Sequence, residues 1–280
     1  MFMKLESIFY KNFFGFNFVN IIPGSYNVNF VLERNFIKSK WVGKISKRIR
    51  SKFTDLDSRA LLAFRLSELV GAGIPQTKII AARRVNFPPE FIQPQDRIDD
   101  KICITAYKGV NLEEFLKTNR EDKLKNIAQI FENFVFNLWV GNYDRKNSDY
   151  VVNRDSFIFP IDYQLLGPGF SENDEVSLGA YARSYNFNDP ADTGCCLAPV
   201  FINEIKKNKN IDFFNLMVGR INKLSVKSIK RAFRGLYFFK AETKENLNEK
   251  FIEFLLSRRT RLEEKINDWI KSDYLRKISI

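Results

Sequence analysis

The chain has 280 residues, of which 45% are hydrophobic and 28% are charged, and its formal net charge is +12. A chain of this size and composition can bury the core of one large or two modest domains, which excludes disorder as its main state. The sequence contains no histidine. This excludes Ser-His-Asp and Cys-His nucleophile systems, histidine-ligated zinc or iron, and imidazole proton shuttles.

The cysteine content indicates a reducing compartment, and the hydropathy indicates a chain that does not span a membrane. Three cysteines, of which Cys195 and Cys196 are adjacent, cannot form a disulfide framework, so we expect a cytoplasmic protein. No stretch approaches eighteen uninterrupted apolar residues, and the first residues lack a signal-peptide pattern, so we expect no transmembrane segment. The positive charge predicts attraction to polyanions such as nucleotides, nucleic acid or anionic lipid.

The first half of the chain is predicted to consist of strands and one helix. Short β-branched or aromatic runs indicate strands, and Pro23-Gly24-Ser25 between the first two indicates a hairpin. The helix is predicted to begin after Thr54 or Asp55 and to end near Gly71. Its apolar positions at helical spacing are Leu62, Leu66, Leu69 and Val70. The predicted strands cover 13–22, 26–33, 41–46, 78–85 and 102–106.

After Gly109 the pattern becomes mainly helical, with helices predicted at 112–116 and, as a long amphipathic run, at 122–140. Two strands follow, at 150–152 and 157–161, around an Asn-Arg-Asp turn. A loop-rich section at 164–199 leads into helices that continue to residue 270.

This order predicts an α+β fold with two lobes. A small β-rich lobe with one helix would cover 1–106, and a larger, mainly helical lobe would cover 107–280. Two lobes joined by a connector near 106–109 would form a cleft, where ligands commonly bind.

Three carboxylates surround the second predicted hairpin. Asp144 and Asp149 lie on the loop that enters it, and Asp162 follows its second strand. Because a hairpin folds the second strand beside the first, the three can converge on one point. Phosphoryl transfer uses one carboxylate to orient the attacking hydroxyl and further oxygen ligands to hold Mg²⁺. A solvated turn is the alternative interpretation.

The runs GNYDRKNSDYVV (141–152) and FIFPIDYQ (157–164) resemble the catalytic and metal-binding loops of the HipA-like kinases and of the phosphatidylinositol 3- and 4-kinases. Fainter similarity to the same families covers 63–75, 104–116 and 251–266. The resemblance implies a two-lobed protein-kinase-like fold and transfer of the γ-phosphoryl group of ATP, with Mg²⁺ or Mn²⁺, to a hydroxyl acceptor. A protein serine or threonine is the favoured acceptor, and a lipid or small molecule is the alternative.

Residue by residue, the resemblance makes Asp144 the catalytic aspartate and Asp162 a metal ligand. Asp149 occupies a metal-binding position that usually holds asparagine, and Lys146 replaces the histidine of the loop. A lysine can meet a γ-phosphate as a cation, but it cannot cycle protons near neutral pH. These departures leave open a second hypothesis, a nucleotide-binding pseudokinase or other binding module.

The lysine that anchors the nucleotide phosphates is predicted to be Lys44 on the third strand, with Lys38 and Lys40 as alternatives. A surface lysine is the competing interpretation of Lys44. Its acidic partner from the helix is predicted to be Asp57, with Asp55 and Glu68 less favoured.

Further nucleotide contacts are predicted from backbone position. Gly24 and Ser25, in the first hairpin turn, are candidates for covering the phosphates, and the resemblance makes Ser25 a candidate for autophosphorylation. The backbone of Ala106, Tyr107 and Lys108 is predicted to receive adenine.

The segment 38–52 contains seven lysines and arginines and no acid. A solvated face is the simplest interpretation. The functional alternative is docking to an anionic partner, either a lipid surface or RNA.

Overall fold

The computed structural model describes residues 15–22, 28–35, 37–45, 55–88, 101–119, 121–142, 145–163, 166–167, 211–238 and 246–271. The chain divides into two compact units. The first unit comprises 1–57 and 75–107, and the second comprises 58–74 and 108–280. The division therefore differs from the predicted one at 106/107, because the helical segment 58–74 belongs to the second unit.

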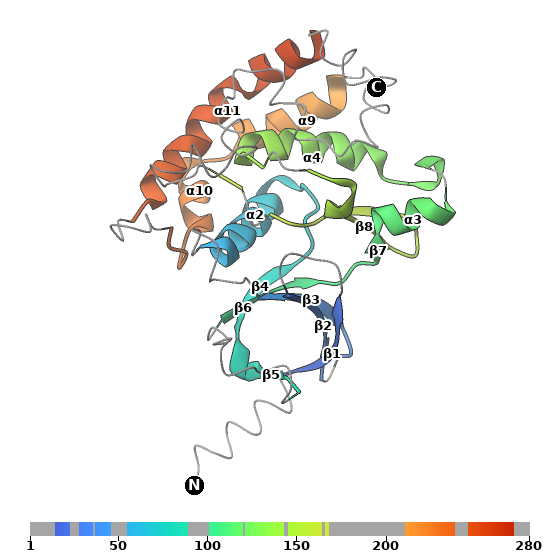
Figure 1. Ribbon diagram of the computed structural model, residues 1–280. Coiled ribbons are helices and arrows are strands. Elements are labelled where there is room, and N and C mark those ends of the chain that lie inside the picture. Colours follow the sequence, from blue (N-terminus) through green and yellow to red (C-terminus); the bar gives the residue numbers. More distant parts are fainter. Residues whose placement is uncertain are drawn as a thin grey trace, which may run out of the picture. The chain divides into compact units, whose positions relative to one another are not determined.

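The first unit is built on a curled six-stranded sheet (Figure 1) with the order β4-β6-β3-β2-β1-β5. All neighbouring strands are antiparallel except β1 and β5, which are parallel. The strands are β1 (Phe16–Ile22), β2 (Val28–Arg34), β3 (Lys40–Ile45), β4 (Thr77–Ala81), β5 (Val85–Asn86) and β6 (Lys101–Ala106). The predicted β1–β2 hairpin is confirmed, but its turn, with Gly24 and Ser25, lies outside the described residues.

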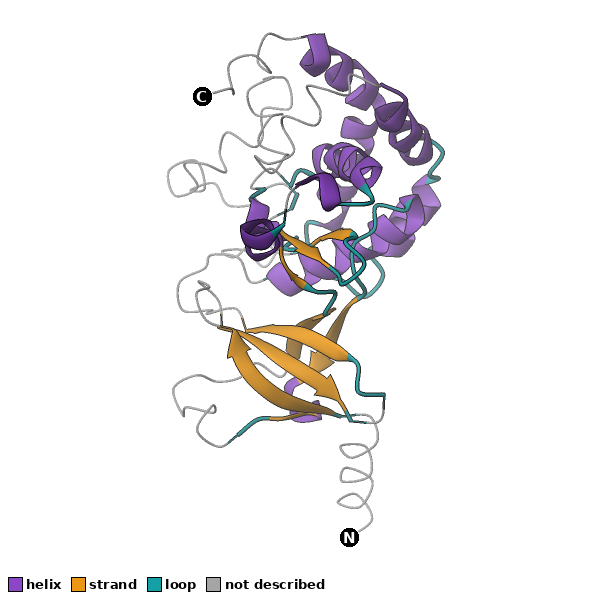
Figure 2. Ribbon diagram, turned by 90° about the vertical axis from the view of Figure 1, so that its right-hand side faces the viewer, coloured by secondary structure: helices purple, strands orange, loops and turns teal. Residues whose placement is uncertain are grey.

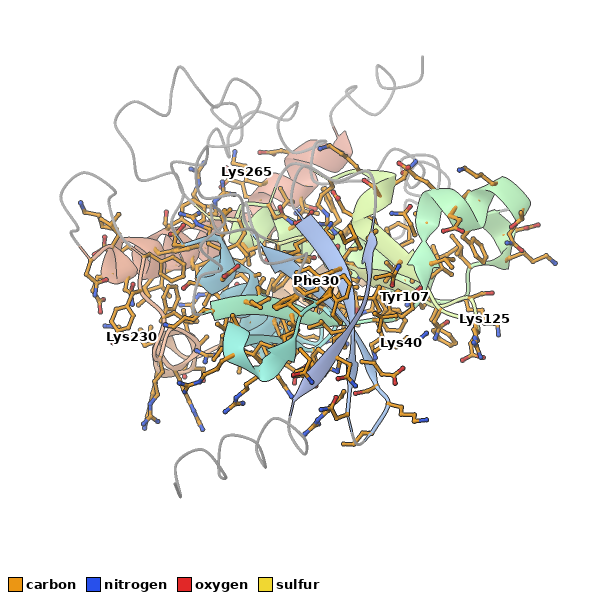
Figure 3. The ribbon with its side chains drawn as sticks, turned by 60° about the horizontal axis from the view of Figure 1, so that its bottom comes forward. Phe30, Lys40, Tyr107, Lys125, Lys230 and Lys265 are labelled. Atoms are coloured by element: carbon orange, nitrogen blue, oxygen red, sulfur yellow. The ribbon has the colours of Figure 1, made fainter. Side chains whose placement is uncertain are left out.

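An apolar cluster on one face of this sheet forms the core of the first unit. Phe30 is fully buried within it and contacts Phe87 edge to face, with 5.3 Å between the ring centroids (Figure 3). Gly43 lies opposite Phe30 in the β2–β3 ladder, and a Cβ there would lie 2.3 Å from the Phe30 ring. The cluster consists of Phe16, Phe30, Leu32, Trp41, Ile80, Val85, Ile102 and Ile104.

The single strand predicted at 78–85 is wrong. β4 ends at Ala81, a 3₁₀ turn covers Ala82–Arg84, and Val85 opens a new strand that pairs with β1. Arg83 and Arg84 are exposed on the turn, whereas the Val85 side chain is buried in the core. The turn therefore redirects the chain so that the arginines stay in water while Val85 reaches the apolar cluster.

The second unit is mainly helical and contains a small antiparallel sheet with the order β7-β8-β9 (Figure 2). The predicted hairpin around Asn153-Arg154-Asp155 is confirmed as β8–β9. None of the helices in the described parts of the chain is long and apolar enough to cross a membrane. The main elements are α2 (Leu56–Val70), β7 (Val110–Asn111), α3 (Leu112–Thr118), α4 (Ile127–Val140), β8 (Tyr150–Val152), β9 (Ile158–Pro160), α9 (Ile211–Asn222), α10 (Val226–Ala232) and α11 (Asn248–Lys271), with 3₁₀ turns η3 (Glu121–Lys123) and η4 (Asn147–Asp149).

Helix α4 is the centre of the second unit and is buried on every side from Ile130 to Val140 except at Glu132. It contacts α9 and α11, and Trp139 Nε1 donates to the Leu255 carbonyl at 2.9 Å. A central helix of this kind needs apolar residues all round rather than one stripe. The composition of α4, in which five of fourteen residues are Phe, Trp or Leu, meets that need.

Helix α2 packs its apolar face into the same core as α4. Leu62, Leu66 and Val70 are buried there, as predicted. Leu69 was expected to join them, because it lies about 20° from Leu62 around the helix, but it is 43% exposed. The buried arc extends from Leu62 in the other direction, to Ala63 and Ser67. This burial explains why α2 belongs to the second unit.

Helix α4 begins at Ile127, later than the predicted start at 122, because the preceding residues hold the hairpin. The Asn126 side chain accepts from the Ile158 amide at 2.7 Å and donates to the Ile158 carbonyl at 2.9 Å. Lys125 N–H donates to the Ser156 carbonyl at 3.0 Å. These bonds anchor β9 to the start of α4.

We expect Gly167→Ala to lower the free energy of unfolding by about 2–4 kcal/mol. Gly167 has φ +83°, and a Cβ would lie 2.0 Å from the Phe251 ring. Left-handed backbone costs an alanine roughly 1 kcal/mol, and overpacking costs roughly 1–3 kcal/mol. Urea denaturation of the full chain, followed by circular dichroism, measures the change.

Gly235→Ala is the matched control. Gly235 also has positive φ, +72°, but nothing lies within 4 Å of the added Cβ, so only the backbone term of about 1 kcal/mol applies. Equal losses in the two variants would show that Gly167 does not pack against Phe251 in this way.

Candidate active site

The candidate site lies in the second unit, where α4 ends and the β8–β9 hairpin begins. Gly141 ends the helix with φ 70°, and the Asn142 amide donates to the Asn137 carbonyl at 2.9 Å. This left-handed cap is a common helix ending for which glycine is preferred. Asp144 follows two residues later and lies outside the described residues, so its catalytic role stays a prediction.

The structure brings Asp149 and Asp162 to the same end of the hairpin. Asp149 directly precedes β8, and Asp162 is the second residue after β9. The ladder extends beyond the strands, since Ile161 N–H donates to the Asp149 carbonyl at 2.7 Å. Their joint role as metal ligands stays a prediction.

Asp149 is buried and already serves the local structure. Its Oδ2 atom accepts from the Lys146 amide at 2.8 Å, which closes the η4 turn. A buried carboxylate needs such bonds, because loss of water is costly for a charge. The Lys146 side chain itself is exposed.

Asp162 has the opposite environment. Its side chain is exposed and its backbone has φ 63°, which is uncommon for a residue other than glycine. Aspartate tolerates this conformation better than most residues, and such backbone outliers cluster at functional sites. The positive φ therefore marks Asp162 as a candidate functional residue, independently of the sequence around it.

Arg145 joins the two segments that carry these acids. Its Nη1 atom donates to the Ile161 carbonyl at 2.8 Å and to the Asp162 carbonyl at 3.3 Å, while Nη2 donates to the Asp149 carbonyl at 3.4 Å. The guanidinium is buried between two aromatic rings, with its Cζ atom 4.8 Å from the ring centroids of Tyr150 and Tyr163. One buried cation therefore fixes the backbone on both sides of the site.

Burial alone would lower the pKa of Arg145, but Tyr163, Tyr150 and Asp149 act in the opposite direction, and the net effect is a raised pKa. Burial also raises the pKa of Tyr163, with Arg145 opposing it. Arg145 therefore stays cationic and Tyr163 neutral near neutral pH.

Two buried asparagines of α4 hold the tyrosines in turn. Asn133 Nδ2 donates to the Tyr163 hydroxyl at 2.7 Å, and the Tyr150 hydroxyl donates to Asn133 Oδ1 at 3.3 Å. Asn137 Nδ2 donates to Asn133 Oδ1 at 3.0 Å. Sequence reasoning missed these residues and Arg145, although two asparagines four apart in an apolar helix were a visible signal.

Among the described residues, no group of three or more His, Cys, Asp or Glu side chains is arranged to hold a metal ion. Asp149 and Asp162 lie at one end of a hairpin, and proteins usually bind Mg²⁺ through only one or two carboxylate ligands. A Mg²⁺ or Mn²⁺ ion held by these two acids therefore stays a prediction.

The predicted phosphate lysine, Lys44, lies in the first unit. It is half-buried and faces Asn29 and Cys103 in the neighbouring strands, next to Gly43 and hence on the other face of the sheet from Phe30. Lys38 and Lys40 are exposed, so Lys44 is the most enclosed of the three candidates.

The backbone predicted to receive adenine is partly engaged elsewhere. The Ala106 amide donates to the Gln76 carbonyl at 2.8 Å, and the Tyr107 amide donates to the Lys40 carbonyl at 3.0 Å (Figure 3). Both N–H groups are engaged within the first unit, and the contact of this backbone with adenine stays a prediction. The Lys108 ammonium lies 5.3 Å from the Phe159 ring centroid in the second unit.

We expect Arg145→Lys to destabilise the protein by about 2–4 kcal/mol. A lysine keeps the charge but has no planar fork to reach both segments, so buried carbonyls lose donors at roughly 1–3 kcal/mol each. Urea denaturation measures the loss. Hydrogen exchange at the Ile161 amide, which is bonded to Asp149, should accelerate.

Arg154→Lys is the control, because Arg154 is exposed on the turn of the same hairpin. It should change stability by less than about 0.5 kcal/mol. Equal stability of the two lysine variants would refute the linking role of Arg145.

No model of a known protein family matches the chain, and no curated protein matches it.

Proposed function

We propose that the protein is an ATP-dependent phosphotransferase that transfers the γ-phosphoryl group to a hydroxyl acceptor. The observation that carries the proposal is the placement of Asp149 and Asp162 at one end of the β8–β9 hairpin, with the backbone of both held by Arg145. Phosphoryl transfer depends mainly on positioning and electrostatic stabilisation, and two acids on a backbone held by one cation suit that task.

The two described acids suit different parts of this task. Asp162 is exposed and can present its carboxylate to a metal–nucleotide complex, whereas Asp149 is held against η4. A bound Mg²⁺ or Mn²⁺ would offset the negative charge of the phosphates. Lys146, exposed on the same loop, supplies a cation for the γ-phosphate.

The roles of two further residues rest on the sequence alone. Asp144 would orient the acceptor hydroxyl and take its proton, and Lys44 would bind the α- and β-phosphates. The resemblance favours a protein serine or threonine as acceptor over a lipid headgroup or a small molecule.

A binding module that holds a nucleotide without transferring phosphate is the second candidate. The observation in its favour is the burial of Asp149, whose Oδ2 atom caps the Lys146 amide. A carboxylate oxygen that accepts this hydrogen bond is less free to coordinate a metal ion.

We expect Asp162→Asn to reduce metal-dependent phosphoryl transfer by about a hundredfold or more, because each electrostatic group aimed at the transferring charge is typically worth such a factor. The assay incubates the full chain with γ-labelled ATP and a host lysate, in Mg²⁺ and separately in Mn²⁺. Thermal shift with ATP follows binding in parallel.

Asp155→Asn is the matched control, since Asp155 is exposed at the opposite end of the same hairpin. It should transfer phosphate like the wild type. Labelling that is the same in both variants would overturn the assignment of Asp162. An ATP-dependent thermal shift in the wild type without transfer in either metal would instead establish the binding module.

A further inference from the structure

A second basic region lies in the second unit, far along the chain from segment 38–52. Residues 213–240 contain seven lysines and arginines and no acid. The described part covers most of α9, all of α10 and the turn that follows. The seven are Arg220, Lys223, Lys227, Lys230, Arg231, Arg234 and Lys240.

Helix α10 concentrates this charge on one face. Ile229 and Ala232 are buried in the core, which leaves the opposite side of the helix to solvent. At 100° per residue, the exposed positions fall within one arc, and the next turn continues it. The residues of this α10 face are Val226, Lys227, Lys230, Arg231 and Arg234, all of them exposed.

Within the described part of the second unit, little of this charge is neutralised. Lys230 forms an ion pair with Glu249 of α11, with 3.1 Å between Nζ and Oε2. Among the described residues, Lys227, Arg231 and Arg234 form no ion pair. A fourth cation adds to the field, since Arg65 of α2 donates to the carbonyls of Ala232 and Arg234 at 2.9 and 2.7 Å.

The bonds from Arg65 also give the face a fixed shape. They tie the C-terminal end of α10 to α2, which is itself packed in the core. Burial lowers the pKa of Arg65, but the guanidinium remains charged near neutral pH. These bonds therefore hold the end of α10, and the turn that carries Arg234, against α2.

Exposed apolar groups accompany the cations. Val226 is 42% exposed on the same arc of α10, and Tyr237, three residues after Arg234, is 57% exposed. Cations mixed with exposed apolar and aromatic side chains are typical of surfaces that lie in the interface of a membrane. Charge alone would suit any polyanion.

We infer that the α10 face docks on an anionic lipid surface, with Lys227, Arg231 and Arg234 at the headgroups and Val226 and Tyr237 at the boundary with the acyl chains. An RNA could use the cations and stack a base on the tyrosine, but it offers no partner to an exposed valine. The inference goes beyond the proposed function and does not depend on it.

The test measures co-sedimentation of the full chain with phosphatidylcholine vesicles, with and without phosphatidylserine. Each Lys or Arg near an anionic bilayer is worth about fivefold in affinity, so Lys227→Gln/Arg231→Gln/Arg234→Gln should bind about a hundredfold more weakly. Binding should require phosphatidylserine and weaken as salt is added.

The matched control is Lys117→Gln/Lys123→Gln/Arg154→Gln, which removes three exposed cations from the α3 side of the second unit. Figure 3 shows Lys125, which belongs to that side, and Lys230 of the α10 face at opposite edges of the unit. The control has the same net charge as the first variant. It should bind the vesicles at least about tenfold more tightly than the first variant does. Equal binding by the two variants would overturn the inference.

A second pair of measurements separates lipid from nucleic acid. Val226→Ser/Tyr237→Ser should weaken vesicle binding severalfold while leaving the salt dependence unchanged, because it removes apolar contacts and no charge. An oligouridylate that binds through the α10 cations, with no vesicle binding, would overturn the lipid assignment. Thermal melting of each variant checks that the fold is intact.

Discussion

The buried guanidinium of Arg145 is the constraint on which the candidate site depends. It donates to three backbone carbonyls, those of Asp149, Ile161 and Asp162. A cation out of water is costly unless polar groups replace its hydration, and here carbonyl dipoles and two aromatic faces do so. Because one rigid group serves both segments, the two acids cannot shift independently. Their spacing is a property of Arg145 as much as of the hairpin.

This arrangement is built upward from α4. The asparagine pair of that helix costs desolvation in an otherwise apolar surrounding, and it is tolerated because its amides bond to each other and to Tyr150 and Tyr163. The tyrosines in turn enclose Arg145. A chain of polar contacts thus runs from the most buried helix of the second unit to the backbone carbonyl of Asp162, and it ties a short hairpin to the core.

Local patterns in the sequence were enough to predict the two hairpins, β3 and most helices, because alternation and turn residues act over a few neighbours. Properties set by distant contacts could not be read in this way. The packing of α2 in the second unit, the capture of Val85 by β1 and the engaged amides of Ala106 and Tyr107 all depend on partners remote in sequence. The acids of the site were visible as residues, but the cation that positions them was not, since an arginine in a loop is usually solvated.

The same cation also compensates the buried charge of Asp149. An extra negative charge beside Asp162 would ordinarily repel it, and burial would make the repulsion stronger. Here the charge of Asp149 lies close enough to Arg145 to raise its pKa, and the Lys146 amide donates to the carboxylate. The arginine therefore balances the added charge within the loop itself. Replacing Asp149 by asparagine would remove one of the groups that raise the pKa of Arg145, so each of these two side chains stabilises the charge of the other.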